Sequence, residues 1–264
     1  PLALSVVQGQ QMMEACELAE VPLFVAYYRL CLANDLQIEE ASEAGAIGAV
    51  RFVTSQLFHP IGPAEQDKRS LPWRVFPGIA GGGHFVDLAS HQLDYLDYLF
   101  GPIVAVQGVA QNQAGRYPAE DIVTANFRFE SGVMACGLWC FTVHAGTQRD
   151  TVEIVGSKGR ISFSTFDHTV PVSIESGDSP RKTFNLPQVT HIQQPLIKTV
   201  VDELCADGSC PSVGRTAART NWVMDQVLRN PSNNVPKSGQ YSAWRPRLRI
   251  EGYMTDHASP LVVN

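Results

Sequence analysis

The stretch that decides the fold is residues 81–100, which read GGGHFVDLASHQLDYLDYLF. Three glycines lead into a segment with the apolar periodicity of a helix. At 3.6 residues per turn, one face of this helix carries a polar stripe, formed by Asp87, His91, Asp94 and Tyr98. The opposite face is apolar and expected to be buried, with Val86, Ala89, Leu93, Leu96 and Phe100. A carboxylate one turn before a histidine is costly in so apolar a helix, so the stripe is the first candidate site.

Composition and charge exclude several classes of protein. A length of 264 residues with 44% hydrophobic content indicates an ordinary globular protein with a large core. The net charge of −6 argues against a nucleic-acid partner and against an anionic membrane surface. No run approaches the roughly 18 apolar residues of a membrane span. The six cysteines form no Cys-x-x-Cys pair, which favours free thiols and a cytoplasmic protein over disulfides or metal.

The rest of the chain combines helical and strand patterns. Helices are predicted over residues 4–20, 34–45, 192–206 and 214–229. Strands are predicted over residues 50–58, 104–110, 123–129, 133–142, 151–155, 160–164, 171–176 and 182–186. With a hairpin turn expected at residues 156–159, this succession of short strands predicts an antiparallel or mixed sheet.

Two segments stand apart from this scheme. Residues 21–28 form a nearly continuous apolar run, which predicts a strand covered on both faces as in a parallel sheet. No earlier strand is available to pair with it. After Asn230 the composition shifts to Pro, Ser and Asn without periodicity, so we expect an irregular extension there.

Asp87 and His91 are the strongest chemical candidates. Histidine titrates in the range needed to take or give a hydroxyl proton in an alcohol–ketone redox step, and a carboxylate at i, i+4 can orient it. The alternative is a structural pair on the helix surface. His84 extends the pattern to a metal triad and to metal-dependent hydrolysis. Seven helical residues rise about 10 Å, whereas two ligands of one metal lie about 3 Å apart, so we expect no metal.

Three further motifs allow more than one interpretation. The run Gly81–Gly83 either lets backbone approach a ligand or forms a flexible entry to the helix, and no Gly-x-Gly-x-x-Gly loop occurs in the sequence. Tyr27, Tyr28 and Arg29 end the apolar run, where ligand contacts are common in α/β sheets; packing residues and a surface charge are the alternative. For the Trp73–Arg74 pair we expect a packing role.

Cys136 and Cys140 lie four residues apart on a predicted strand and therefore share a face. Their neighbours in the sequence are apolar. We expect inert thiols in the core.

The pattern Gly81-Gly82-Gly83-x-x-x-Asp87-x-x-x-His91-x-x-Asp94 resembles the signature of the Gfo/Idh/MocA oxidoreductases, the relatives of glucose–fructose oxidoreductase and inositol dehydrogenase. Further stretches that resemble the family are PLFVAYYR at 22–29, GAIGAVRFV at 45–53, VEIVGSKG at 152–159 and the run from 191 to 221. Together the similar stretches cover about residues 1–229.

The resemblance implies an α+β domain with an open, mainly antiparallel mixed sheet, whose exposed face commonly supports homo-oligomers. It implies NAD or NADP as cofactor and a sugar, cyclitol or related alcohol as substrate. Carried over residue by residue, His91 is the acid/base and Asp87 its partner. We expect Tyr28, Arg29 and His84 to border the substrate, and we expect no cofactor-binding residue in this chain.

In the family a Glu-Lys-Pro motif supplies a catalytic lysine, and Pro1 is similar to its proline. The resemblance therefore implies that the lysine and most of a dinucleotide-binding domain precede this sequence, so that the chain is inactive alone. The expected division is a remnant of that domain over 1–28, a substrate and oligomerisation domain over 29–230 and the irregular tail over 231–264. A non-catalytic dimerisation or regulatory module of the same fold is the alternative.

Overall fold

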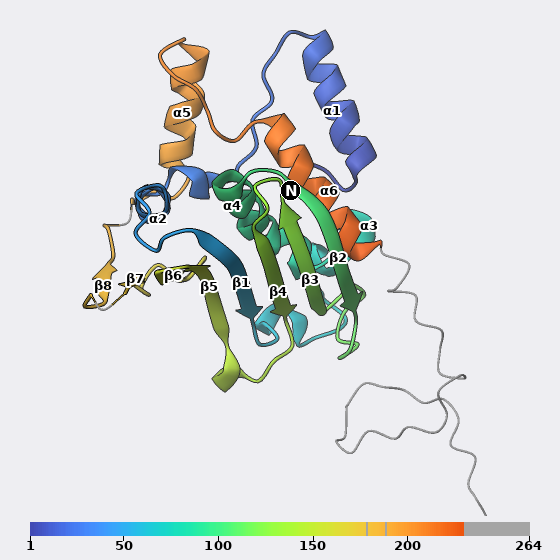
Figure 1. Ribbon diagram of the computed structural model, residues 1–264. Helices are drawn as coiled ribbons and strands as arrows, with labels where there is room; N and C mark the ends of the chain where they lie inside the picture. Colours follow the sequence, from blue (N-terminus) through green and yellow to red (C-terminus); the bar gives the residue numbers. More distant parts are fainter. Residues whose placement is uncertain (178, 188, 230–264) are drawn as a thin grey trace, which may run out of the picture.

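The sheet is the central element of the molecule. The computed structural model describes residues 1–177, 179–187 and 189–229, and the tail expected over 231–264 lies outside them. Eight strands form one open sheet in the order β2-β3-β4-β1-β5-β6-β7-β8 (Figure 1). Strands β1 and β4 run parallel, and every other neighbouring pair runs antiparallel. The predicted α+β fold with an open mixed sheet is confirmed.

The strands begin and end close to the predicted positions. They are β1 (Val50–Phe58), β2 (Ile103–Gln111), β3 (Ile122–Phe129), β4 (Met134–Cys140), β5 (Arg149–Gly156), β6 (Gly159–Phe163), β7 (Val172–Ser176) and β8 (Lys182–Phe184). In β3 the alternation decides which face is covered, because Val123, Ala125 and Phe127 are buried while the polar residues between them are exposed.

The helices also follow the sequence pattern. They are α1 (Val6–Leu18), α2 (Ala33–Glu43), α3 (Pro77–Ala80), α4 (Ser90–Phe100), α5 (Gln194–Leu204) and α6 (Gly214–Leu228). Ser5 caps α1 by accepting a hydrogen bond from the backbone N–H of Gln8, and Gly45 takes a positive φ of 69° just after α2. Helices α1 and α5 project beyond the sheet at the top of Figure 1.

The core lies between the inner face of the sheet and the segment 85–100. A π-helical turn over Phe85–Ala89 leads directly into α4, a feature that no sequence periodicity predicts. The expected apolar face of this segment is buried in full: Val86, Ala89, Leu93, Leu96 and Phe100. Phe85 packs edge-to-face on Trp139 of β4, with ring centroids 5.1 Å apart. Packing against the sheet therefore fixes which side of the helix carries the polar stripe.

The prediction of a buried parallel strand over 21–28 is wrong. This segment makes one isolated antiparallel bridge, between Phe24 and Val213, and a 3₁₀ turn begins at Tyr28. Val21 is exposed, and Pro22 has no N–H to donate to a sheet. The extended backbone bonds instead to the segment before α6, where Val25 N–H donates to the carbonyl of Ser212. A continuous apolar run alone does not distinguish such a packed loop from a central strand.

The core position expected for Cys136 and Cys140 is also wrong. They share a face of β4 as predicted, but Ala135 and Trp139 occupy the inner face of that strand. Cys136 is therefore exposed on the outer face, beside Thr54 of β1. In the part of the chain that the structure describes, no helix is both long and apolar enough to cross a membrane.

Candidate functional site

His91 is enclosed by aromatic rings. Its imidazole lies 5.4 Å from the ring of Tyr27, 5.1 Å from that of Tyr28 and 6.3 Å from that of Phe166, measured between centroids. The Nδ1 atom is buried and makes no hydrogen bond to any described residue. Burial lowers the pKa of His91 to about 4, with a smaller contribution in the same direction from Arg29. The imidazole is therefore neutral at neutral pH.

Asp87 does not pair with His91. Its Oδ2 accepts a hydrogen bond from Nε of Arg74 at 3.2 Å, and both side chains are about half exposed. The guanidinium of Arg74 also lies over the ring of Trp73, 4.8 Å from its centroid. Arg74 is thus part of the candidate site and not the packing residue that the sequence suggested. No sequence pattern joins Arg74 to Asp87, because they come from a loop and a helix 13 residues apart.

His84 has a different surrounding from His91. Its Nε2 lies 2.9 Å from Oε1 of Glu65, a side chain that is 6% exposed. Because a carboxylate only accepts hydrogen bonds, Nε2 of His84 carries the hydrogen. The other oxygen of Glu65 accepts from the N–H of Gly62 at 2.7 Å, which orients the carboxylate. Sequence reasoning missed Glu65, which lies in a loop without periodicity.

The run Gly81–Gly83 serves close packing. A Cβ on Gly82 would lie 2.3 Å from Cγ2 of Val86, and one on Gly83 would lie 2.7 Å from Cβ of Ala119. The N–H of Gly83 donates to Oε1 of Glu120 at 2.7 Å. The glycines therefore let the start of the helix approach the connection between β2 and β3, which is neither of the two alternatives that the sequence left open.

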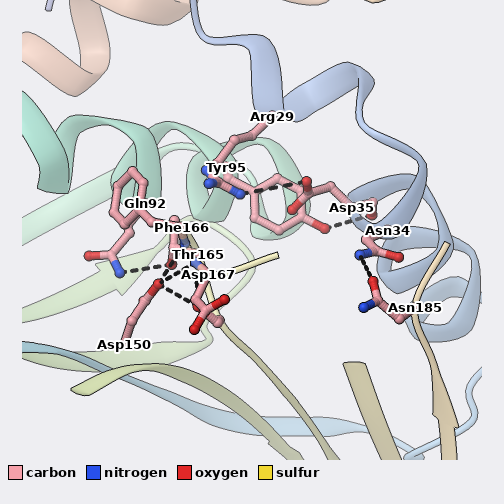
Figure 2. A network of polar contacts seen from close by, with 11 residues as sticks. Arg29, Asn34, Asp35, Gln92, Tyr95, Asp150, Thr165, Phe166, Asp167 and Asn185 are labelled. Atoms are coloured by element: carbon pink, nitrogen blue, oxygen red, sulfur yellow. Dashed lines mark hydrogen bonds and ion pairs between the residues drawn. The ribbon is translucent and has the colours of Figure 1, made fainter. Parts of the chain in front are cut away.

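Arg29 is a buried cation, not a surface charge. It is 2% exposed, and its nearest carboxylate contact joins Nη1 to Oδ2 of Asp35 at 3.8 Å (Figure 2). Its Nε and Nη2 atoms are buried and make no hydrogen bond to described residues. Burial raises the pKa of Asp35 to about 7, although Arg29 acts against this rise. The guanidinium lies 4.9 Å from the ring centroid of Phe166 and 5.6 Å from that of Tyr28.

The loop that carries Phe166 is held in place by polar contacts that Figure 2 shows. Oδ2 of Asp150 accepts hydrogen bonds from the hydroxyl of Ser164 and from the N–H of Phe166, each at 2.5 Å. The side chain of Gln92, next to His91 in α4, donates to the hydroxyl of Thr165 at 2.9 Å. These bonds fix the wall of the site that faces His91.

A cavity of about 610 Å³ lies beside the start of the described chain, and none of the four polar-stripe residues lines it. It lies between residues 1–4, helix α1 and the segment from Trp73 to Ala80, and its lining is mainly apolar. Mainly apolar cavities of this size with a few polar groups at one side are typical small-molecule sites.

The structure brings most of the predicted site residues together around one histidine. Tyr28 and Arg29 lie beside His91, Asp87 lies one turn away on the same segment, and His84 forms a separate pair with Glu65. Asp94 is buried and accepts a hydrogen bond from Thr220, and burial raises its pKa to about 7. Within the described ranges, no group of three or more His, Cys, Asp or Glu side chains is arranged to hold a metal ion.

Comparison with known proteins identifies the family. Residues 36–162 match the GFO/IDH/MocA C-terminal domain. Oxidoreductase P35 of Formosa agariphila is 30% identical over 227 residues, which are 85% of this chain and 68% of that protein. Myo-inositol 2-dehydrogenase of Thermotoga maritima is 28% identical over 185 residues, 67% of this chain and 52% of that protein. The chain therefore belongs to the Gfo/Idh/MocA family of oxidoreductases, as the resemblance implied.

A solved structure supports the same assignment of the fold. The WlbA dehydrogenase from Bordetella pertussis, in complex with NADH and UDP-GlcNAcA, superposes with a TM-score of 0.71 at 25% identity. The superposition covers 89% of this chain and 69% of that chain. The chain thus spans about two thirds of the length of P35 and WlbA, and about half of the inositol dehydrogenase.

The described residues do not fit a nicotinamide dinucleotide, the cofactor that the family implies. A dinucleotide site places a Gly-x-Gly-x-x-Gly loop between a strand and a helix, and the sequence has no such loop. Gly83 is packed against Ala119 and donates its N–H to Glu120, so the run serves packing and does not form such a loop. The chemical roles assigned to residues of this chain therefore concern their contacts with the substrate.

Proposed function

We propose that this chain forms the substrate-binding and proton-transfer part of an NAD- or NADP-dependent oxidoreductase for sugars, cyclitols or related alcohols. In this proposal His91 accepts the hydroxyl proton of the alcohol, and a nicotinamide, if bound beside the substrate, would supply the hydride acceptor. Asp87 and Arg74 border the substrate together with Tyr28. Arg29 and His84 belong to the wall behind these residues.

One observation carries the proposal. His91 is a neutral histidine with an unpartnered ring nitrogen, enclosed by aromatic rings on the same helical face as an exposed carboxylate–guanidinium pair. A neutral imidazole can accept a proton, and aromatic walls exclude water from it. Sugars and polyols suit such a site, because hydroxyl groups bond to the Asp87–Arg74 pair and the apolar ring faces pack on Tyr28. The relatives named above are oxidoreductases, including an inositol dehydrogenase.

We further propose that residues 29–229 act as the substrate and oligomerisation domain, with copies paired through the outer face of the sheet. This face carries large exposed apolar side chains on neighbouring strands, with Phe52 of β1 directly beside Met134 of β4. Val109 of β2 lies further along the same face. Phe52 and Met134 form an adjacent exposed apolar pair, and exposed apolar residues that lie together are typical of protein–protein contacts.

The proposed pairing is tested by light scattering. Met134→Glu places a charge at the centre of the outer face, and we expect it to lower the dimer population at a given concentration. Gln10→Glu, on an exposed position of α1, is the control and leaves the mass unchanged. A wild-type protein that stays monomeric at high concentration would contradict the pairing.

The enzymatic proposal is tested by turnover of the whole protein that carries this chain. A panel of aldoses, cyclitols and glycosides is offered with NAD⁺ and NADP⁺ in turn, and the reduced cofactor is followed by absorbance. We expect His91→Ala to lower kcat by about 10²–10⁴-fold, the usual contribution of a general acid/base. Arg215→Ala, at an exposed position of α6, is the matched control.

Two outcomes would contradict this assignment. No turnover of any panel member with either cofactor would remove the proposed activity. Turnover that persists in His91→Ala would remove the role of His91 and favour the non-catalytic module, in which the sheet and its outer face are all that the fold retains.

A further inference from the structure

The buried guanidinium of Arg29 is poorly compensated. Its one carboxylate contact, to Asp35, is 3.8 Å long, and two of its nitrogen atoms have no partner among the described residues. Burial raises the pKa of Asp35 to about 7, so below that pH the carboxyl is mostly protonated and cancels little of the positive charge. A buried cation without a hydrogen-bonded counter-ion is costly. Such an arrangement calls for an explanation beyond packing.

The position of Arg29 relative to His91 supplies one. The guanidinium is stacked near the rings of Tyr28 and Phe166, at 5.6 and 4.9 Å from their centroids. The same two rings contact the imidazole of His91, at 5.1 and 6.3 Å between centroids. Arg29 therefore holds both walls of the histidine enclosure and places a fixed positive charge beside it.

No carboxylate balances this charge at the imidazole. The other titratable groups on the segments packed around His91 are the tyrosines Tyr27 and Tyr28, Asp87 and Asp94 of its own helical segment, Asp35 behind Arg29, Asp150 of β5, and Asp167 and His168 of the loop after β6. Asp87 is paired with Arg74, and Nδ1 of His91 has no acceptor among the described residues. A protonated imidazole would thus lie near one cation without an anion in contact.

We propose that Arg29 is a positioning residue for His91, one that holds the Tyr28 and Phe166 rings around the imidazole and keeps it in the neutral, proton-accepting form. Its meaning for catalysis rests on the proposed function, in which a neutral His91 starts the oxidation of an alcohol. Arg29 takes the place of the carboxylate partner that such a histidine commonly has. A carboxylate favours the protonated imidazole, whereas the guanidinium disfavours it.

The test is the titration of His91 in the chain itself, followed by the chemical shifts of its ring protons. Wild type is compared with Arg29→Met, which keeps the apolar stem and removes the charge, and with Arg29→Lys, which keeps the charge. We expect the midpoint to rise by roughly one pH unit or more in Arg29→Met and to stay low in Arg29→Lys. Contacts between the His91 and Tyr28 ring protons report whether the enclosure persists. Arg215→Met is the matched control, with an unchanged midpoint.

Each outcome bears on the proposal. An unchanged midpoint in Arg29→Met overturns it, as does a midpoint in Arg29→Lys that rises as far as in Arg29→Met, since charge would then not be the cause. If Arg29→Met fails to fold, Arg29→Gln takes its place as the variant without the charge, and an unchanged midpoint there overturns the proposal. Turnover that is insensitive to His91→Ala would remove the proposed function and leave the titration result standing, so the two failures are distinguishable.

Discussion

His84 and His91 lie seven residues apart on the same helical segment, yet their electrostatic surroundings are opposite. His84 donates to the buried carboxylate of Glu65 at 2.9 Å. His91 has aromatic neighbours, a buried guanidinium close by and a ring nitrogen without a partner. The carboxylate-bound histidine is the one further from the proposed chemistry.

The difference teaches that the helix positions a histidine but does not decide its chemistry. Both histidines belong to one helical segment, and both partners come from other parts of the sequence. Glu65 belongs to the loop after β1, and Arg29 to the 3₁₀ turn before α2. Burial and the nearby guanidinium of Arg29 lower the pKa of His91 and favour its neutral form.

The pH dependence of stability should separate His91 from the rest of the protein. The unfolded chain binds a proton at His91 as the pH falls below about 6.5, whereas the folded chain does so only near 4. Folded stability contributed by this group is therefore present above pH 6.5 and lost as the pH falls to about 4. The size of the loss, at 1.36 kcal/mol per pH unit, is roughly 3 kcal/mol. Denaturant unfolding of His91→Gln should lack this loss.

The comparison with His91→Gln is needed because other groups titrate in the same window. Burial raises the pKa of Asp35 and of Asp94 to about 7, so their protons are held more tightly in the folded state and favour it at low pH. These contributions are present in both proteins and cancel in the difference. The free energy of unfolding is plotted against pH for wild type and for His91→Gln. If the two curves run parallel between pH 6.5 and 4, the enclosure does not disfavour protonation of His91.

The sequence predicts the scaffold of this site far better than its contacts. Periodicity identifies the buried face of the helix from Val86 to Phe100, because burial against a sheet leaves a mark every third or fourth residue. Periodicity does not predict the partner of Asp87. Arg74 lies in a loop, and its orientation depends on the stacking with Trp73 and on the turns around it. The π-helical turn over Phe85–Ala89 likewise leaves no signal in local propensity.

The family resemblance recovers part of what periodicity misses, because it singles out Asp87 and His91 from a motif. It also suggested a pairing between them that the structure replaces with Asp87–Arg74. Arg29 shows the same limit. Its position at the end of an apolar run predicts a ligand contact or a surface charge; an exposure of 2% rules out the surface charge, and the ligand contact stays a prediction. Long-range packing decides such cases.

The pair formed by His84 and Glu65 should contribute more to the free energy of unfolding than to turnover. Glu65→Ala removes the acceptor of two donors, His84 Nε2 and the N–H of Gly62, in a largely buried place. Leaving a buried donor without a partner costs about 1–3 kcal/mol, and we expect a loss near 2 kcal/mol in urea unfolding. Glu65→Gln retains an acceptor and should lose less. If Glu65→Ala abolished turnover while the protein stayed folded, His84 would belong to the reacting centre after all.

The smallest effect on the free energy of unfolding is expected for the pair formed by Asp87 and Arg74. Both partners are about half exposed, at 41% and 49% of their side-chain area, so solvent screens their attraction. A double-mutant cycle with Asp87→Asn and Arg74→Met should give a coupling free energy below about 1 kcal/mol. Such a weak pair can exchange partners at little cost, which is what a group that bonds to a substrate hydroxyl requires. A coupling of several kcal/mol would mean that the pair is structural, and the substrate would then have to find its hydrogen bonds elsewhere along the helix.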